Sequence, residues 1–148
     1  NMRIRLIGFI DQLPEATRRV VEKAVEDTKD NTGMTLCFAL NYGSRAEILQ
    51  AVKEIAVDVS NGEYDAESIN EEVFENYLQT NFLGDLSQPD LMIRTSGEQR
   101  LSNFLLWQLA YSEYYFTDIF WPDFSKEDLE EAILTYQKRQ RRYGGLIS

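Results

Sequence analysis

The chain has 148 residues, 43% of them hydrophobic, and a formal net charge of −10. This length is enough to bury a core, and such an acidic balance disfavours general nucleic-acid binding through phosphate contacts. The absence of histidine excludes Ser-His and Cys-His nucleophilic pairs and imidazole general bases. Because the single cysteine, Cys37, cannot form an intrachain disulfide, we expect a reducing, cytoplasmic setting.

The first half of the chain alternates strand and helix patterns. Residues 2–9 alternate apolar and polar side chains, which predicts a strand. Since this pattern starts with the chain itself, we expect the sequence to be the later part of a longer one. Pro14 suits the first turn of a helix that runs to about Thr28, and the apolar run over 36–40 predicts a buried parallel strand. A helix after Arg45 is expected to place one set of side chains on its inner side: Ile48, Val52, Ile55, Ala56 and Val59.

The second half continues this alternation. Ser68 to Glu71 form a capping-box pattern that predicts the start of a third helix. A short strand is expected over 91–93, a buried helix over 102–111 because that segment is apolar nearly all round, and an aromatic-rich strand over 114–121. Ser125 is expected to cap a last helix that reaches about Tyr143. The order predicts one α/β domain over 1–148, with a largely parallel sheet and helices on both faces.

Polar side chains follow two of the predicted strands. Asn41 and Arg45 follow the second strand, and Arg94 and Arg100 follow the third. If those strands are neighbours, these side chains converge beyond the carboxyl ends of the sheet, where ligands bind in α/β folds. Guanidinium groups match phosphate oxygens, and Ser102 at a helix start would add donors, so the pattern indicates a diphosphate pocket beside an apolar wall.

Each of these residues also has a plainer interpretation. Arg94 could be a cation at a strand end, Arg100 a solvated loop residue and Ser102 an ordinary helix cap. Taken together, their spacing before an apolar segment favours the anion site about as strongly as it favours these separate roles.

Glu113 lies among aromatic residues, where a carboxylate is costly unless it is paired or bound to a cation. A hard metal such as Mg²⁺ that bridges phosphate oxygens would suit it. An ion pair with Arg94 or Arg100 is an equally good interpretation. The basic cluster over 138–142 either complements a helix dipole or supplies a second anion contact, reaching into a partner subunit.

Five segments together resemble the cis-prenyltransferase family, in its undecaprenyl diphosphate synthase branch, over essentially all 148 residues. The segments are FALNYGSRAE at 38–47, IRTSGEQRLSNFLLWQ at 93–108, YSE at 111–113, FWPDF at 120–124 and RRYGG at 141–145.

The resemblance implies an enzyme of prenyl chain elongation. Members of the family condense isopentenyl diphosphate with farnesyl diphosphate and its longer products, and so make the undecaprenyl diphosphate used as a cell-wall lipid carrier. Carried over position by position, the isopentenyl diphosphate contacts would be Arg94, Arg100, Leu101 and Ser102.

The resemblance also implies a cofactor and a partner. Glu113 would ligate Mg²⁺, and Arg142 and Gly144 would contribute to the site across a homodimer. The family has no transmembrane segment, although its lipid product goes to the membrane, and no apolar run here approaches the ~20 residues that span a bilayer.

One family motif has no counterpart in these 148 residues. The Asp-Gly-Asn-Gly-Arg-Trp loop, which binds the allylic diphosphate and supplies the catalytic aspartate, is not in the sequence. We therefore expect no catalytic residue in this chain and no turnover by the chain alone. Two alternatives remain: a non-catalytic subunit or dimerisation module of a prenyltransferase complex, and an unrelated phosphate-binding domain that prefers nucleotides.

Overall fold

The computed structural model describes residues 1–139, which divide after Gly84 into two compact units. Each unit is described by itself. The expectation of one domain over 1–148 stays a prediction.

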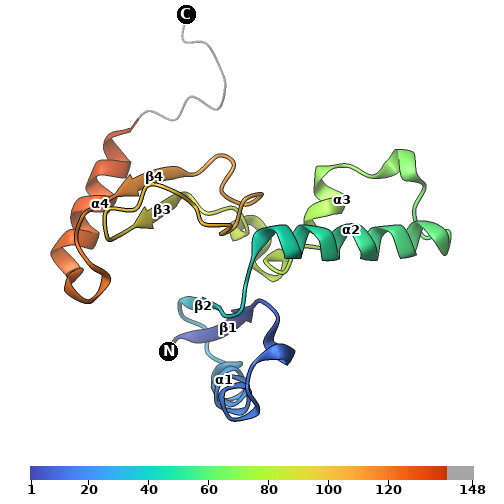
Figure 1. Ribbon diagram of the computed structural model, residues 1–148, viewed down its shortest axis with the longest axis horizontal. Coiled ribbons are helices and arrows are strands. Elements are labelled where there is room, and N and C mark those ends of the chain that lie inside the picture. The colour runs from blue at the N-terminus through green and yellow to red at the C-terminus, as the bar shows by residue number, and fades with distance from the viewer. Residues whose placement is uncertain (140–148) are drawn as a thin grey trace, which may run out of the picture. The chain divides into compact units, whose positions relative to one another are not determined.

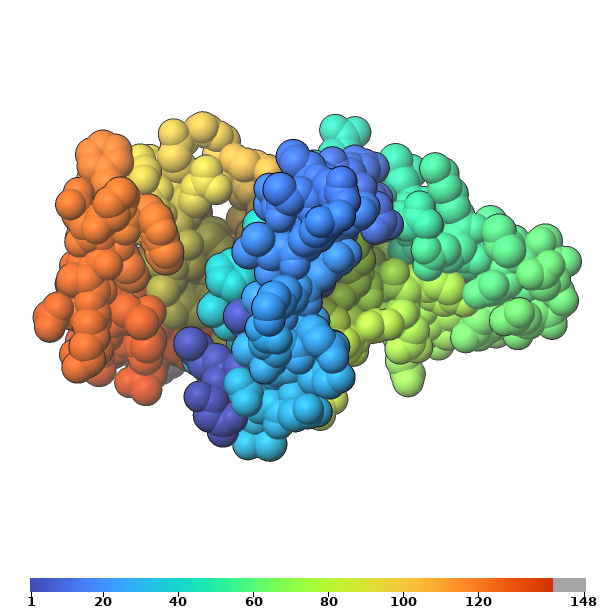
Figure 2. All heavy atoms as spheres, turned by 90° about the horizontal axis from the view of Figure 1, so that it is seen from below, coloured from blue at the N-terminus to red at the C-terminus, as the bar shows by residue number. Residues whose placement is uncertain are grey.

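The first unit is built on two parallel strands, β1 (Arg3–Ile7) and β2 (Thr35–Ala39), which pair in register from Arg3↔Thr35 to Ile7↔Ala39 (Figure 1). Helix α1 (Glu15–Thr28) connects them, as a parallel crossover requires. The Thr28 hydroxyl accepts a hydrogen bond from the Ile4 amide at 3.0 Å, which fastens the end of α1 to β1. The space-filling view shows α1 on the surface (Figure 2), and none of its residues is buried.

Helix α2 (Ser44–Ser60) buries a different stripe from the predicted one. Its buried residues are Ser44, Glu47, Ala51 and Ile55. Of the predicted inner residues only Ile55 is buried, and Val52 is 50% exposed. The stripe is helical in its spacing, but two of its four positions are polar, so a search for apolar side chains selects the neighbouring face.

Helix α3 (Glu71–Glu75) begins two residues later than the capping pattern predicted. Asn70 caps it, with its side-chain oxygen accepting from the Val73 amide at 2.9 Å. Ser68 belongs instead to a short 3₁₀ turn over Ala66–Ser68.

The second unit is built on β3 (Leu91–Arg94) and β4 (Glu113–Phe116), which are also parallel, from Leu91↔Glu113 to Arg94↔Phe116. Helix α4 (Lys126–Lys138) follows and lies beside β4 (Figure 1). It ends before the predicted boundary, because Arg139 has an extended backbone. The prediction of parallel strands with helices, an α/β class, is confirmed, and the described strands form two separate pairs.

The predicted helix over 102–111 is wrong. The segment forms consecutive tight turns, with positive φ at Ser102 (51°), Asn103 (63°) and Leu105 (46°). Positive φ is incompatible with a right-handed helix. The segment is nevertheless buried at Leu105, Gln108 and Leu109, so its apolar composition reports burial and not helix.

The start of α4 gives a first prediction. Ser125 and Asp128 form a complete capping box, and the hydrogen bonds from Ser125 lower the pKa of Asp128. Replacing Ser125 with alanine leaves the Asp128 amide without its acceptor, and we expect a loss of about 1 kcal/mol of unfolding free energy in urea titrations. Ser68→Ala, which removes a hydroxyl that caps no helix, is the control. Equal losses in both variants would contradict the role of the capping box.

Candidate functional site

Within residues 1–139, left-handed backbone at non-glycine residues occurs in the loops that follow β2 and β3. Among residues 1–139, the non-glycine residues with positive φ are Asn41, Ser96, Ser102, Asn103 and Leu105. Asn41 comes shortly after the last residue of β2, and the other four come after β3. Such conformations cost free energy, and they persist where the surrounding structure enforces them, which is commonly at functional sites. The strain therefore points to the same two loops as the polar sequence pattern.

Arg94 and Ser102 come together in the loop after β3. Arg94 is the last residue of that strand, and its guanidinium donates to the Ser102 hydroxyl over 3.4 Å. Ser102 does not cap a helix, so the predicted helix-start donors are not formed. The serine is instead brought to Arg94 by the loop over 95–101, which contains the turn at Ser96 and Gly97. The pair offers guanidinium and hydroxyl donors on one side of the loop, which suits a phosphate group.

The turn over Ser96 and Gly97 supports this loop but has no backbone donors to spare. The Ser96 amide donates to Ile119 O at 2.8 Å and the Gly97 amide to Thr117 O at 3.0 Å. The pairing of β3 with β4 thus continues beyond both strands and holds the turn in place. An anion at this loop must therefore be bound mainly by side chains, not by these amides.

Arg100 lies in the same loop, paired with Glu98. The Arg100 side chain is 67% exposed, and an exposed ion pair of this kind contributes at most about 1 kcal/mol. A diphosphate could replace Glu98 as its partner at little cost. Leu101, between Arg100 and Ser102, is half-buried.

Glu113 is paired with neither of the predicted arginines. Arg139 at the end of α4 donates from Nη1 to a Glu113 carboxylate oxygen at 2.7 Å and to Tyr114 O at 2.8 Å. Sequence reasoning missed Arg139, which it treated only as part of the basic cluster. Among residues 1–139, no group of three or more His, Cys, Asp or Glu side chains lies close enough together to hold a metal ion without other ligands. Arg142 and Gly144 lie outside the described residues.

In the first unit, the loop after β2 is held by a buried carboxylate. Glu47 is 1% exposed. Its carboxylate accepts hydrogen bonds from the Tyr42 hydroxyl and, at 2.8 Å, from the backbone N–H of Gln79. The Gln79 side chain in turn accepts from the amide of Gly8, just after β1. Sequence reasoning missed both Glu47 and Gln79. The available signal was an acidic residue three positions after Ser44, on the inward side of α2.

Asn41 and Arg45 also belong to the first unit. The side-chain amide of Asn41 donates to Phe9 O at 3.1 Å and to the side-chain oxygen of Gln12 at 3.2 Å, so it joins the segments that follow β1 and β2. Their convergence with Arg94 and Arg100 stays a prediction.

Cys37 is unsuited to nucleophilic chemistry. Burial raises the pKa of its thiol, and the nearby Arg5 only partly opposes this. The thiol is therefore protonated at neutral pH. This agrees with the interpretation of Cys37 as a small, partly buried hydrophobic residue.

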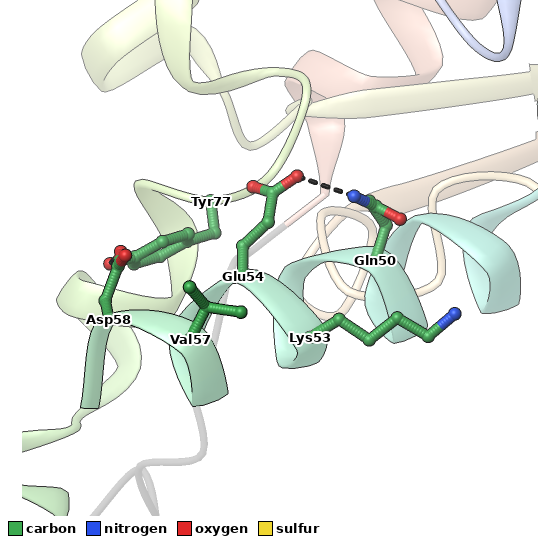
Figure 3. A pocket seen from close by; sticks show the side chains of 6 residues that line it. All are labelled: Gln50, Lys53, Glu54, Val57, Asp58 and Tyr77. Carbon is green, nitrogen blue, oxygen red and sulfur yellow. Dashed lines mark hydrogen bonds between the residues drawn. The ribbon is translucent and has the colours of Figure 1, made fainter. Parts of the chain in front are cut away.

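A hollow of about 370 Å³ lies along the carboxyl-terminal half of α2 (Figure 3). It is lined by Gln50, Lys53, Glu54, Val57, Asp58 and Tyr77. The Tyr77 hydroxyl donates to Asp58, and this hydrogen bond is the main reason that the pKa of Tyr77 is raised above its usual range. The strained loops are not part of this hollow.

The Tyr77–Asp58 contact gives a second prediction. Because the phenol donates to a carboxylate, Tyr77 should ionise at higher pH than an ordinary tyrosine, and Asp58→Asn should return its pKa toward 10. Stability from this contact is present below the ordinary tyrosine pKa and is lost as the pH rises toward the raised one. Phenolate absorbance during alkaline titration, compared with a Tyr77→Phe control, measures the change. Identical titrations of the parent and Asp58→Asn would contradict the assignment.

No helix among residues 1–139 has the length and apolar content of a membrane span.

Comparison with known proteins adds to this geometry. The model of a family described as "Putative undecaprenyl diphosphate synthase" matches residues 1–144. An isoprenyl transferase of Halalkalibacterium halodurans is 56% identical over 146 residues, which are 99% of this chain and 56% of that protein. An isoprenyl transferase of Geobacillus kaustophilus is 57% identical over 146 residues, with the same shares. The chain thus spans little more than half the length of these relatives.

Two solved structures resemble the chain. Lavandulyl diphosphate synthase from Lavandula x intermedia, solved with dimethylallyl diphosphate, matches with a TM-score of 0.93 and 40% identity, over 97% of this chain and 60% of that one. A structure titled as a probable undecaprenyl diphosphate synthase from Campylobacter jejuni matches with a TM-score of 0.79 and 33% identity, over 97% and 63%. With strained, arginine-bearing loops at its strand ends and these matches along nearly its whole length, the chain belongs to the prenyltransferase family of isoprenyl transferases and undecaprenyl diphosphate synthases.

Proposed function

We propose that this chain serves prenyl chain elongation, in which isopentenyl diphosphate adds to farnesyl diphosphate and its longer products to give undecaprenyl diphosphate. The contact between Arg94 and Ser102 carries the proposal, because it places a guanidinium and a hydroxyl in a strained loop beyond the carboxyl end of β3. Such donors suit a diphosphate, because a guanidinium can bond two phosphate oxygens at once.

The proposed binding residues for isopentenyl diphosphate are Arg94, Arg100, Leu101 and Ser102. Arg94 and Arg100 would neutralise the diphosphate, and Ser102 would donate one further hydrogen bond. Glu98 holds Arg100 until the anion arrives. Leu101 would support the loop through its half-buried side chain.

In the reaction, the allylic carbon–oxygen bond breaks and diphosphate leaves. A carbon–carbon bond forms to the isopentenyl double bond, and loss of a proton leaves a new cis double bond. No residue of this chain is proposed as the catalytic acid or base, since the family's Asp-Gly-Asn-Gly motif is not among its 148 residues. The chain by itself is expected to bind and not to turn over.

Glu113 fits a role in Mg²⁺ binding. Its side chain is 28% exposed and offers oxygen ligands. Mg²⁺ commonly takes one or two carboxylates and completes its shell with substrate phosphates and water, so it does not need the cluster of three ligating side chains that residues 1–139 lack. When bound, the ion would neutralise negative charge on the diphosphate. Glu113 itself would have to exchange Arg139 for the cation.

The intact protein is proposed to act as a homodimer in the cytoplasm, with Arg142 and Gly144 contributing across the dimer. Its lipid product would be delivered to the membrane for cell-wall synthesis.

Isopentenyl incorporation by the intact gene product tests the proposal. Arg100→Ala and Glu113→Ala should each lower kcat/KM by about 100-fold with Mg²⁺ present, as loss of a charged contact to a reacting diphosphate does. Arg19→Ala removes the same charge from an exposed ion pair on α1 and should change little. Near-normal rates in both site variants would overturn the assignment.

A further inference from the structure

The carboxylate of Glu113 is bound by a guanidinium from the carboxyl end of α4. Arg139 Nη1 donates to a Glu113 carboxylate oxygen at 2.7 Å and to Tyr114 O at 2.8 Å. The backbone of Glu113 is fixed separately, because its amide donates to Asp90 O at 3.0 Å. The side chain of Glu113 can therefore turn without a change in the strand, and its ion pair with Arg139 holds it in one position.

This ion pair is less exposed than an ordinary surface pair. The Glu113 and Arg139 side chains are 28% and 37% exposed. By contrast, Lys126 and Glu130, which pair on the surface of the same helix, are 79% and 58% exposed. Partial removal from water strengthens a charge-assisted hydrogen bond and makes it costly to leave the carboxylate without a positive neighbour. Glu113 is therefore most stable with a positive charge beside it, from Arg139 or from a metal ion.

Arg139 and a divalent cation compete for this carboxylate. Both are positively charged, so their mutual repulsion disfavours binding of both to one side chain. Because the described residues contain no group of three or more ligating side chains, a cation at Glu113 would depend on this carboxylate more than a cation in a full protein cage does. The cost of breaking the ion pair therefore lowers the affinity for the cation directly.

We propose that Arg139 is a positioning residue that occupies Glu113 in the absence of metal and is displaced when a divalent cation binds. This role rests on the proposed function, in which Mg²⁺ binds to Glu113. By linkage, the cation weakens the contact between Arg139 and Glu113 as much as that contact weakens binding of the cation. Cation binding is thereby coupled to the end of α4, where Arg139 has an extended backbone and its amide donates to Tyr136 O at 3.0 Å.

The displaced guanidinium keeps one hydrogen bond. The contact of Arg139 with Tyr114 O does not involve the carboxylate, so the arginine can stay beside β4 while Glu113 binds the cation. It can then return to Glu113 when the cation leaves. The exchange is therefore reversible, and the partly buried carboxylate has a counter-charge in both states.

Titration of the intact gene product with Mn²⁺ alone, followed by water-proton relaxation, tests this competition without substrate or turnover. Arg139→Gln removes the charge and keeps a donor for Tyr114 O, so we expect Mn²⁺ to bind about 10-fold more tightly, as the loss of one competing charged hydrogen bond implies. Arg139→Lys retains the charge, and its affinity should lie closer to that of the parent than to that of Arg139→Gln. Lys126→Gln is the control, because it removes the same charge from an exposed pair on the same helix and should leave the affinity nearly unchanged.

Glu113→Gln separates this inference from the proposed function. Loss of Mn²⁺ binding in Glu113→Gln, together with unchanged or weaker binding in Arg139→Gln, would overturn the role of Arg139 and leave Glu113 as the metal-binding residue. Unchanged Mn²⁺ binding in Glu113→Gln would instead overturn the assignment of the metal to Glu113.

Amide exchange in the unmutated protein gives a second readout that needs no variant to fold. Saturating Mg²⁺ should speed exchange of the Arg139 amide, because release of the side chain loosens the last turn of α4. The Leu129 amide, which donates to Ser125 O at 3.2 Å at the start of the same helix, should exchange at the same rate with and without the ion. An Arg139 exchange rate that Mg²⁺ does not change would overturn the coupling.

Discussion

Replacing Gly8 with alanine is expected to lower the unfolding free energy by at least about 3 kcal/mol, the largest effect of any glycine substitution in the described residues. Gly8 follows β1 with φ +117°, a conformation that side chains rarely allow. An added Cβ would also lie 1.9 Å from Leu40 O. That carbonyl belongs to a backbone segment held by hydrogen bonds from the Leu40 amide to Ile7 O and from the Phe9 amide to Asn41 O, so it cannot move aside cheaply.

Gly62→Ala is the matched control for this prediction. Gly62 also has positive φ, +79°, but nothing lies within 4 Å of its added Cβ. It therefore carries the conformational cost alone, about 1–2 kcal/mol. Urea unfolding of both variants separates the steric term at Gly8 from the backbone term. Equal losses would show that the approach of Leu40 to Gly8 is not needed for stability.

Much of the fold could be predicted because the strands and longer helices carry simple periodic patterns. β1 and β2 follow the alternating and continuous apolar runs, and α4 begins where Ser125 and Asp128 predict it. The 102–111 segment could not be predicted in the same way. Its apolar side chains indicate burial, but they do not show that Ser102, Asn103 and Leu105 take left-handed conformations, which follow from contacts in the folded unit.

The candidate site could be predicted in part for a similar reason. Arg94 and Ser102 are eight residues apart, and a turn between them brings them together. The partner of Glu113 is 26 residues away, at the end of a helix whose length the sequence overestimated. The short separation of Arg94 and Ser102 along the sequence therefore allowed their contact to be anticipated, whereas the pairing of Glu113 with Arg139 depends on the packing of α4 beside β4. The role of Arg94 and Ser102 in binding an anion stays a prediction.

The strand-end loops are stabilised by hydrogen bonds to neighbouring segments of the same unit. Strain at Asn41 is offset by its hydrogen bonds to Phe9 and Gln12, and the loop after β3 by the bonds to 117–119. Such support lets a loop keep a costly conformation, and so keeps its donors in place before a ligand arrives. Substitutions of the residues that support these loops should therefore lower the free energy of unfolding more than they change ligand affinity.

Glu47 is the residue of this kind with the largest expected effect, because it is a carboxylate buried to 1% exposure. Glu47→Ala would leave the Gln79 amide and the Tyr42 hydroxyl without their acceptor and open a cavity beside α2. We expect a loss of about 3 kcal/mol of unfolding free energy, and a smaller loss of about 1–2 kcal/mol for Glu47→Gln, whose amide can still accept one bond.

Glu54→Ala on the same helix is the control, since Glu54 is exposed and accepts only a surface hydrogen bond from Gln50 at 2.8 Å. Its loss should stay within about 0.5 kcal/mol. Urea unfolding ranks the three variants, and amide exchange at Gly8 adds a local measurement, because Glu47 reaches Gly8 through Gln79. Faster exchange at Gly8 in Glu47→Ala than in Glu54→Ala would show that the carboxylate joins the ends of β1 and β2. If Glu47→Ala and Glu54→Ala lost the same free energy, the loop after β2 would have to be held by contacts other than those of Glu47.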